Sequence, residues 1–155
     1  MSDLTTTDQP SAIAVCNGCS PELWQRLTDP NLGWAKGSEL ARQWEDRSEL
    51  SAVATALELR ARPAGEQFVI AALTPLVTLY GVSDKSPGEW RAFWRFYITA
   101  LQDLPREAIE RGVADYVAAP DSDFFPKPGP LKALCQKRAE TILTAYGRAR
   151  KALVV

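Results

Sequence analysis

The segment from Ser86 to about Leu104 constrains the fold most, because its apolar residues recur at helical spacing. Ser86 and Glu89 form a capping box around Pro87, which is a typical start of a helix. The apolar positions at i, i+3, i+4, i+7, i+11 and i+14 are Trp90, Phe93, Trp94, Tyr97, Leu101 and Leu104. We expect this aromatic face to lie in the core; a stacking platform for single-stranded nucleic acid is the alternative.

Two more helices are predicted in the first half of the chain. Ser20, Pro21 and Glu22 place a capping serine and a first-turn proline at the start of a short helix. A longer helix is expected from Ser38 to about Ala61, where good helix formers such as Ala, Leu, Glu and Arg predominate.

Three further helical segments are predicted in the second half. Residues 66–80 are apolar nearly all the way round, which favours a helix at the buried centre of a bundle, although the β-branched residues also permit a strand. Pro105 begins a helix after a very short turn, and the last helix is expected from about Pro130 to Lys151. The predicted fold class is all-α, a compact bundle of about five to six helices with a mobile N-terminal tail.

The chain of 155 residues is long enough for one domain. We expect residues 1–19 to be a flexible tail, because they are rich in polar residues and lack periodicity. Residues 20–155 should then form a single helical domain. Within it, residues 20–65 would hold acidic N-terminal helices and residues 66–155 the main helical core.

Charge is unevenly distributed along the chain. A formal net charge of −1 argues against nucleic-acid binding by the whole molecule. One face of the last predicted helix nevertheless gathers basic side chains, namely Lys132, Lys137, Arg148, Arg150 and Lys151. This face is either a solvated surface with cations suitably placed near a helix C-terminus, or a contact for DNA phosphates or an acidic partner.

The sequence offers no recognisable catalytic apparatus. It contains no histidine, no phosphate-binding loop and no dinucleotide-binding turn. The Cys16-x-x-Cys19 spacing is either a coincidence or half of a metal site shared between two chains. We therefore expect no enzymatic activity, no catalytic residue, no bound metal and no cofactor.

The N-terminus lacks a basic start, and the longest apolar run near it, residues 12–15, is too short for a signal peptide or a membrane span. We expect a cytoplasmic protein without a membrane partner.

Phe96 lies well off the aromatic stripe of its helix, where Arg91 and Arg95 occupy the other side. It either packs on a second neighbour, which we favour, or marks a contact surface. Phe124, in a proline-rich connector, poses the same question. Exposed aromatic side chains beside arginines are typical of binding hot spots. We therefore count Arg91, Arg95, Phe96 and Phe124 with the basic face as candidate partner-binding or nucleic-acid-binding residues.

The pattern from Ala71 to Lys151 resembles a known family. An apolar helix precedes a helix that Glu89 and Trp90 open; Asp103-Leu104-Pro105, a second helix, the connector Phe124-Phe125-Pro126 and a basic helix follow. This pattern is similar to the phage and prophage replication accessory proteins of the helicase loader/inhibitor type. In that family a helix pair leads into a Phe-Pro-x-x-x-aliphatic turn. Phe125, Pro126 and Leu131 match it here, with one residue more than the usual spacing.

The resemblance covers about half of the chain, and it implies an all-helical protein that binds the replicative hexameric helicase without catalysing a reaction. The expected partner is accordingly a protein, with weak nucleic-acid contact as an addition. Two alternatives remain open: a nucleic-acid-binding module that uses the basic last helix, and a phage-encoded inhibitor of a host defence protein.

Overall fold

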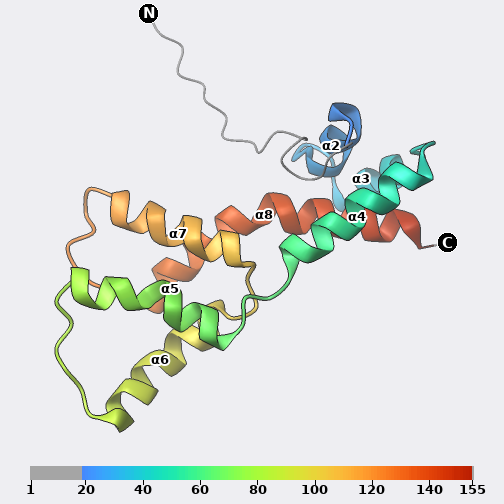
Figure 1. The fold of residues 1–155 in the computed structure, drawn as a ribbon. Helices are drawn as coiled ribbons and strands as arrows, with labels where there is room; N and C mark the ends of the chain where they lie inside the picture. The colour runs from blue at the N-terminus through green and yellow to red at the C-terminus, as the bar shows by residue number, and fades with distance from the viewer. Residues whose placement is uncertain (1–18, 155) are drawn as a thin grey trace, which may run out of the picture. The chain divides into compact units, whose positions relative to one another are not determined.

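The computed structural model describes residues 19–154, and its regular elements over this range are helices. They are α2 (Pro21–Thr28), α3 (Trp34–Arg42), α4 (Arg47–Ala61), α5 (Glu66–Leu79), α6 (Pro87–Leu101), α7 (Arg106–Ala118) and α8 (Pro128–Leu153), as Figure 1 shows. The all-α prediction is confirmed. The predicted flexible tail lies outside the described residues except for Cys19.

The helices form two compact units. Among the described residues, the first unit comprises residues 19–58 and 144–154, and the second runs from Leu59 to Leu143. Helices α4 and α8 therefore each contribute residues to both units. This division differs from the predicted boundary between residues 65 and 66, because the last turns of α8 pack with helices that precede them by a hundred residues or so in the chain.

The core of the first unit consists mainly of leucines and alanines. Its large members on α2 and α4 are Leu23, Trp24, Leu27, Leu50, Val53 and Leu57. Helix α8 adds Ala145, Ala149 and Ala152, whose spacing of four and three residues puts small side chains on one face. A strip of alanines lets neighbouring helices pack closely against this end of α8.

Helix α2 begins as predicted. The Ser20 hydroxyl accepts a hydrogen bond from the Leu23 backbone N–H at 3.3 Å, and Pro21 occupies the first turn. Cys19, which we had assigned to the flexible tail, is only 6% exposed and belongs to the core. The ordered chain therefore begins at least one residue earlier than predicted.

The predicted single helix from Ser38 to Ala61 is wrong, because the chain breaks after Arg42 and α4 starts afresh at Arg47. The cause is Asp46, whose carboxylate accepts a hydrogen bond from the Glu49 backbone N–H at 3.0 Å. An aspartate that caps a backbone N–H in this way favours a new helix start over continuation of the preceding helix.

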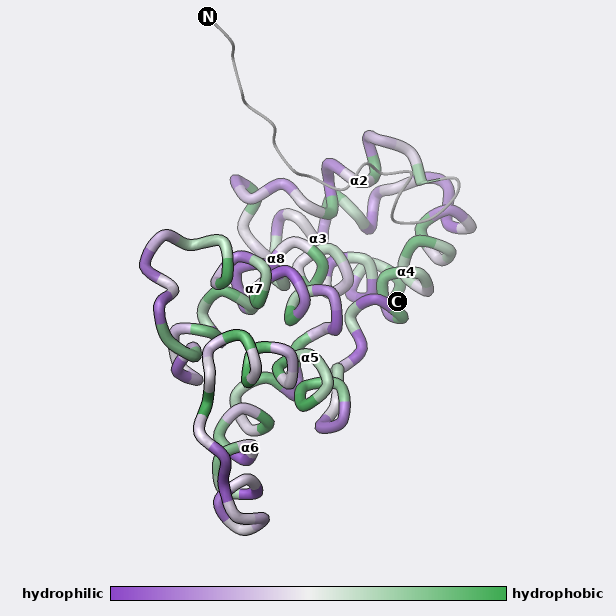
Figure 2. Tube along the Cα trace, turned by 60° about the vertical axis from the view of Figure 1, so that its left-hand side comes forward, coloured by the Kyte–Doolittle hydropathy of each residue, from purple (hydrophilic) through white to green (hydrophobic). Residues whose placement is uncertain are grey.

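Helix α5 resolves the ambiguity of residues 66–80 in favour of a helix, and Pro75 lies inside it. Figure 2 shows hydrophobic residues along this helix. It is nevertheless buried on one face only, through Val69, Leu73 and Leu76, whereas Leu79 is 61% exposed. The expectation of a helix buried all round is therefore wrong. Helix α5 packs against α6 and α7, which leave its remaining surface uncovered.

Helix α6 has the predicted capping box. The Glu89 backbone N–H donates to the Ser86 hydroxyl at 3.3 Å, and the Ser86 backbone N–H donates to the Glu89 carboxylate at 3.3 Å. Hydrogen bonding from Ser86, first from its side chain and then from its backbone N–H, lowers the pKa of the Glu89 carboxylate. A reciprocal cap of this kind sets where the helix starts and hence which side chains face the core.

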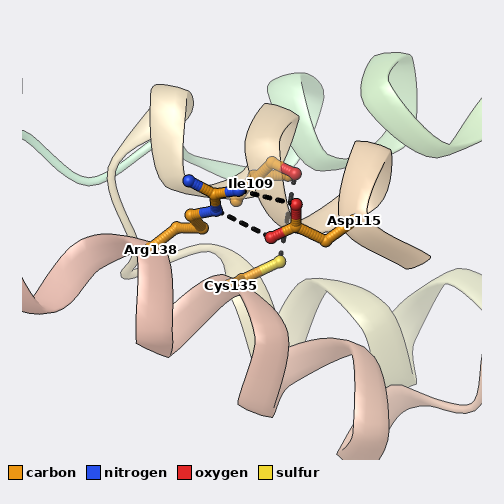
Figure 3. A network of polar contacts seen from close by, with 4 residues as sticks. All are labelled: Ile109, Asp115, Cys135 and Arg138. Carbon is orange, nitrogen blue, oxygen red and sulfur yellow. Dashed lines mark hydrogen bonds and ion pairs between the residues drawn. The ribbon is translucent and has the colours of Figure 1, made fainter. Parts of the chain in front are cut away.

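Helices α7 and α8 approach each other very closely within the second unit. A Cβ atom at Gly112 would lie 2.8 Å from the Cys135 backbone nitrogen and Cα, so only glycine fits this position without movement. Figure 3 shows the polar contacts around this crossing. The Arg138 guanidinium donates to both carboxylate oxygens of Asp115 at 2.7 and 2.8 Å, and the Cys135 thiol points at the Ile109 carbonyl oxygen, 3.9 Å away.

Candidate interaction surfaces

The aromatic stripe of α6 faces the core of the second unit. Tyr97 is buried, and its hydroxyl donates to the Pro126 carbonyl oxygen at 2.7 Å. Burial raises the pKa of Tyr97. The Phe125 ring lies 5.3 Å from the Phe93 ring and 5.4 Å from the Tyr97 ring, so the connector closes over this face. From Phe93 to Leu104 the stripe thus packs on the core of the second unit, as predicted.

The end of the stripe near the start of α6 is less covered. Trp90 and Trp94 are half-buried and stack with ring centres 6.2 Å apart at an interplanar angle of 20°. The Lys85 ammonium lies 5.8 Å from the centre of the Trp90 ring. This cation over an aromatic face adds a modest stabilising contact at a partly exposed position.

The outer face of α6, defined here as Arg91, Arg95 and Phe96, lies in solvent. Phe96 is 67% exposed, and both arginines are exposed. The favoured interpretation of Phe96 as a packing residue is therefore wrong. The stripe packs against the core of the second unit, and no second neighbour among the described residues buries the Phe96 ring.

The two phenylalanines of the connector before α8, Phe124 and Phe125, lie in different environments. Phe124 is 80% exposed, whereas the neighbouring Phe125 packs on the second-unit core and Pro126 is buried. The Tyr116 hydroxyl donates to the Phe124 carbonyl oxygen at 2.6 Å, which holds the backbone while the Phe124 ring stays in water. The exposed phenylalanines Phe96 and Phe124 both belong to the second unit.

The basic residues predicted to share one face of α8 do not share one environment. Lys132 and Lys137 are exposed on the part of α8 that belongs to the second unit. Arg150 and Lys151 are exposed on the part that belongs to the first unit. The Lys151 ammonium lies 5.7 Å from the centre of the Trp34 ring, so it also serves a local contact.

Arg148 was predicted on this solvent face, and that placement is wrong because the residue is only 3% exposed. Its Nη1 atom lies within 3.3 Å of the carbonyl oxygens of Arg26, Leu27 and Asp29, and Nη2 lies 2.6 Å from that of Leu32. The last carbonyl groups of a helix lack intrahelical donors and carry the negative end of its dipole. The guanidinium therefore caps the C-terminus of α2 and the turn that follows.

Gly37 makes room for this buried cation. A Cβ atom at that position would lie 2.5 Å from the Arg148 Nε atom. Arg148 is therefore a structural residue of the first unit, unavailable to a phosphate or to a partner protein. A contact between α3 and the end of α8 could not be inferred from the spacing of charges along a single helix.

A charged hollow in the second unit was not predicted from the sequence. It measures about 520 Å³ and is lined by Leu59, Arg60, Arg62, Pro63, Arg106 and Glu107, all in the second unit. The Arg60 guanidinium donates to both carboxylate oxygens of Glu107 at 3.0 and 2.9 Å. The sequence features that could have indicated this hollow are an arginine-rich helix end before Pro63 and an arginine directly after Pro105.

The cysteines offer little chemistry among the described residues. Burial raises the pKa of the Cys135 thiol to about 12, so it stays protonated and unreactive at neutral pH. Cys16 lies outside the described residues, so the predicted alternatives for the Cys16-x-x-Cys19 spacing stay predictions. Across residues 19–154, no group of at least three Cys, Asp or Glu side chains is arranged to hold a metal ion.

Of the helices between Pro21 and Leu153, none combines the length and the apolar character that crossing a membrane requires. Comparison with protein-family models, with curated proteins and with solved structures yields no match to this chain.

Proposed function

We propose that this chain is a non-catalytic replication accessory protein of the helicase loader/inhibitor type that binds a replicative hexameric helicase through the outer face of α6. The partner class comes from the resemblance of residues 71–151 to that family. The lack of histidine and of a phosphate-binding loop supports the non-catalytic part. The observation that carries the choice of surface is the exposure of Phe96 on a helix that also exposes Arg91 and Arg95.

The energetic reason for this choice is the cost of an aromatic ring in water. Full burial of a phenylalanine side chain is favourable by about 1.5–3 kcal/mol. Phe96 leaves most of that free energy unused in the isolated chain, because 67% of the residue is exposed. A single exposed apolar residue is common on protein surfaces, so the exposed arginines of the same helix are needed to distinguish this surface.

The arginines define the chemistry of the partner surface. Arg91 and Arg95 are one helical turn apart on the exposed side of α6. Guanidinium groups bind carboxylates in a bidentate manner and set the orientation of a complex more than its strength. We therefore expect the helicase surface to offer an apolar pocket for Phe96 bordered by aspartate or glutamate side chains.

The test is the assembly of purified chain with the purified replicative helicase, measured by size-exclusion chromatography with light scattering. A stable complex is expected, and Phe96→Ala should weaken it about tenfold or more, as is usual for a buried aromatic hot spot. Arg91→Ala and Arg95→Ala should each have a smaller effect that salt reduces. Leu79→Ala is the matched control, because Leu79 is an exposed apolar residue of the same unit on a different helix.

Lack of a complex with the helicase would refute the proposed partner. A complex that Phe96→Ala leaves unchanged would instead refute the proposed surface. Affinity capture from lysate at physiological salt adds a third outcome: recovery of a nuclease or other defence component without helicase would favour the alternative of a phage-encoded inhibitor.

The exposed cations of α8 favour a second candidate, the binding of nucleic acid. Arg148 no longer contributes, which leaves Lys132 and Lys137 in one unit and Arg150 and Lys151 in the other. Each phosphate that a cation neutralises adds about −0.9 to the slope of log K against log salt on duplex DNA. A measured slope near zero would exclude this candidate.

A further inference from the structure

Two connections between helices, joined by backbone hydrogen bonds, meet at the hollow near Pro63. The connection between α4 and α5 lies beside the connection between α6 and α7 (Figure 1), where Pro63 and Pro105 face each other in an isolated antiparallel bridge. The Ala64 backbone N–H donates to the Leu104 carbonyl oxygen at 2.9 Å, and the Gly65 N–H donates to the Gln102 oxygen at 3.0 Å. These bonds fix the end of α4 against the start of α7.

Positively charged residues outnumber negatively charged residues around the hollow. The residues that line the hollow include three arginines, Arg60, Arg62 and Arg106, and one acidic residue, Glu107; the Arg106 guanidinium lies 5.2 Å from the centre of the Phe68 ring. Glu107 is already engaged by the Nε and Nη2 atoms of Arg60. The remaining Nη1 atom of Arg60 is buried and has no hydrogen-bond partner. A buried donor without an acceptor is unfavourable.

The start of α7 adds to the positive potential. Its first residue is Arg106, and no side chain caps its N-terminus, because the N-cap residue is Pro105. The first N–H groups of a helix have no intrahelical acceptor, and they lie at the positive end of its dipole. Anions are favoured at such an end, and here the arginines of the hollow lie beside it.

The hollow has the size of a ligand site, since small-molecule sites usually measure about 300–1,000 Å³. Leu59, which is exposed, and Pro63 provide apolar surface next to the charged groups. We propose that this hollow binds the phosphate group of a small organic phosphate, with Arg62 and Arg106 as its principal ligands and Arg60 held in place by Glu107. The planar guanidinium matches phosphate oxygens in a bidentate manner, which explains why arginine rather than lysine is present.

The experiment titrates the full-length chain with inorganic phosphate and with a nucleoside monophosphate, while ¹⁵N backbone signals are followed by NMR at low salt. Saturable shifts are expected at Glu107 and Ala108, the first amides of α7 after Arg106. Arg62→Ala and Arg106→Ala should each weaken binding about three- to tenfold, as expected for loss of one partly exposed charged hydrogen-bond donor. Arg106→Lys should restore only part of the affinity, because the charge remains and the planar fork is lost.

Arg95→Ala is the matched control, since Arg95 is an exposed arginine of the same unit outside the hollow. Equal losses in Arg95→Ala and Arg106→Ala would show non-specific charge attraction and overturn the proposal, as would shifts that never saturate. A short single-stranded oligonucleotide distinguishes the source of the phosphate: tighter binding than the mononucleotide, still sensitive to Arg106→Ala, would identify a nucleic-acid backbone phosphate in the same site. These residues lie outside the outer face of α6, so failure here leaves the proposed helicase surface untouched.

Discussion

In the part of α8 that belongs to the second unit, Lys132 and Lys137 lie in solvent. In the part that belongs to the first unit, Arg148 is buried and donates to backbone carbonyl groups. Both parts are basic in sequence, and a helical wheel predicts an exposed basic face for both. The difference shows that the exposure of a basic side chain on a helix depends on the acceptors that the opposing element presents.

Arg138 is intermediate between these extremes. It lies in the second-unit part of α8, is one third exposed, and pairs with Asp115 of α7. The first-unit part of α8 instead meets the end of α2, whose carbonyl groups accept from Arg148. Arg138 pairs with a carboxylate and stays one third exposed, whereas Arg148 donates to four backbone carbonyl groups and is only 3% exposed.

The largest expected effect comes from Arg148→Met, which keeps the length of the side chain and removes its donors. The free energy of unfolding should fall by about 3–5 kcal/mol, because four carbonyl groups at the end of α2 and in the following turn lose a charged donor. Urea denaturation followed by circular dichroism measures this loss. Arg150→Met is the control, and it should change the stability by less than about 0.5 kcal/mol because Arg150 is exposed. Similar values for the two variants would contradict the capping role of Arg148.

The next largest effect is expected from Gly112→Ala at the α7–α8 crossing. The added Cβ atom would collide with backbone atoms of Cys135, which cannot rotate away, so a loss of about 2–3 kcal/mol is expected. Gly129→Ala is the matched control on α8, since nothing lies within 4 Å of its added Cβ atom. Thermal unfolding of both variants tests the comparison; an unchanged Tm for Gly112→Ala would mean that the helices can separate without cost.

A smaller, pH-dependent effect is expected for Asp115→Asn. Hydrogen bonds from Arg138 outweigh burial and lower the pKa of Asp115 in the folded state. The pair therefore stabilises the protein above the ordinary aspartate pKa of about 3.9, and this stabilisation is lost as the pH falls through the lower, folded-state value. At neutral pH we expect a loss below about 1 kcal/mol, because solvent screens the pair.

Unfolding free energies measured from about pH 7 down to about pH 3 check this sign. The difference between the wild-type chain and Asp115→Asn should shrink as the pH falls. A difference that grows on acidification would contradict the assigned pKa direction.

The smallest effect is expected for Lys132→Ala and Lys137→Ala. Both side chains are exposed, so the free energy of unfolding should change by less than about 0.5 kcal/mol. If the chain binds nucleic acid, the same substitutions should reduce the salt slope of binding while stability stays constant. Denaturation and a salt titration on the same samples separate these two readouts.

Several elements could be predicted because their signals are local. The capping box of Ser86 and Glu89, the serine cap of α2 and the aromatic stripe of α6 each depend on residues within a few positions of one another. The break before α4 was missed although its signal was also local, since Asp46 precedes Glu49 with the spacing of a cap. A run of good helix formers outweighed that signal in our prediction.

The candidate surfaces were predicted less completely. Arg91, Arg95, Lys132, Lys137, Arg150 and Lys151 lie exposed as the helical wheels indicated. The environments of Phe96 and Arg148 were misjudged, and the arginine hollow was missed. Each of these depends on which element lies opposite the residue, and no regular spacing within one helix carries that information.

The sequence by itself determined that the chain is helical, where α2 and α6 begin, and which face of α6 enters a core. These properties follow from propensity, caps and periodicity, all of which act over one or two turns. Only the tertiary structure decided that Arg148 is an internal cap, that Phe96 stays in water, and that arginines from α4 and α7 meet around Pro63. The physical reason is that burial and hydrogen-bond partnership depend on contacts between distant segments, which the chain acquires only when its helices pack.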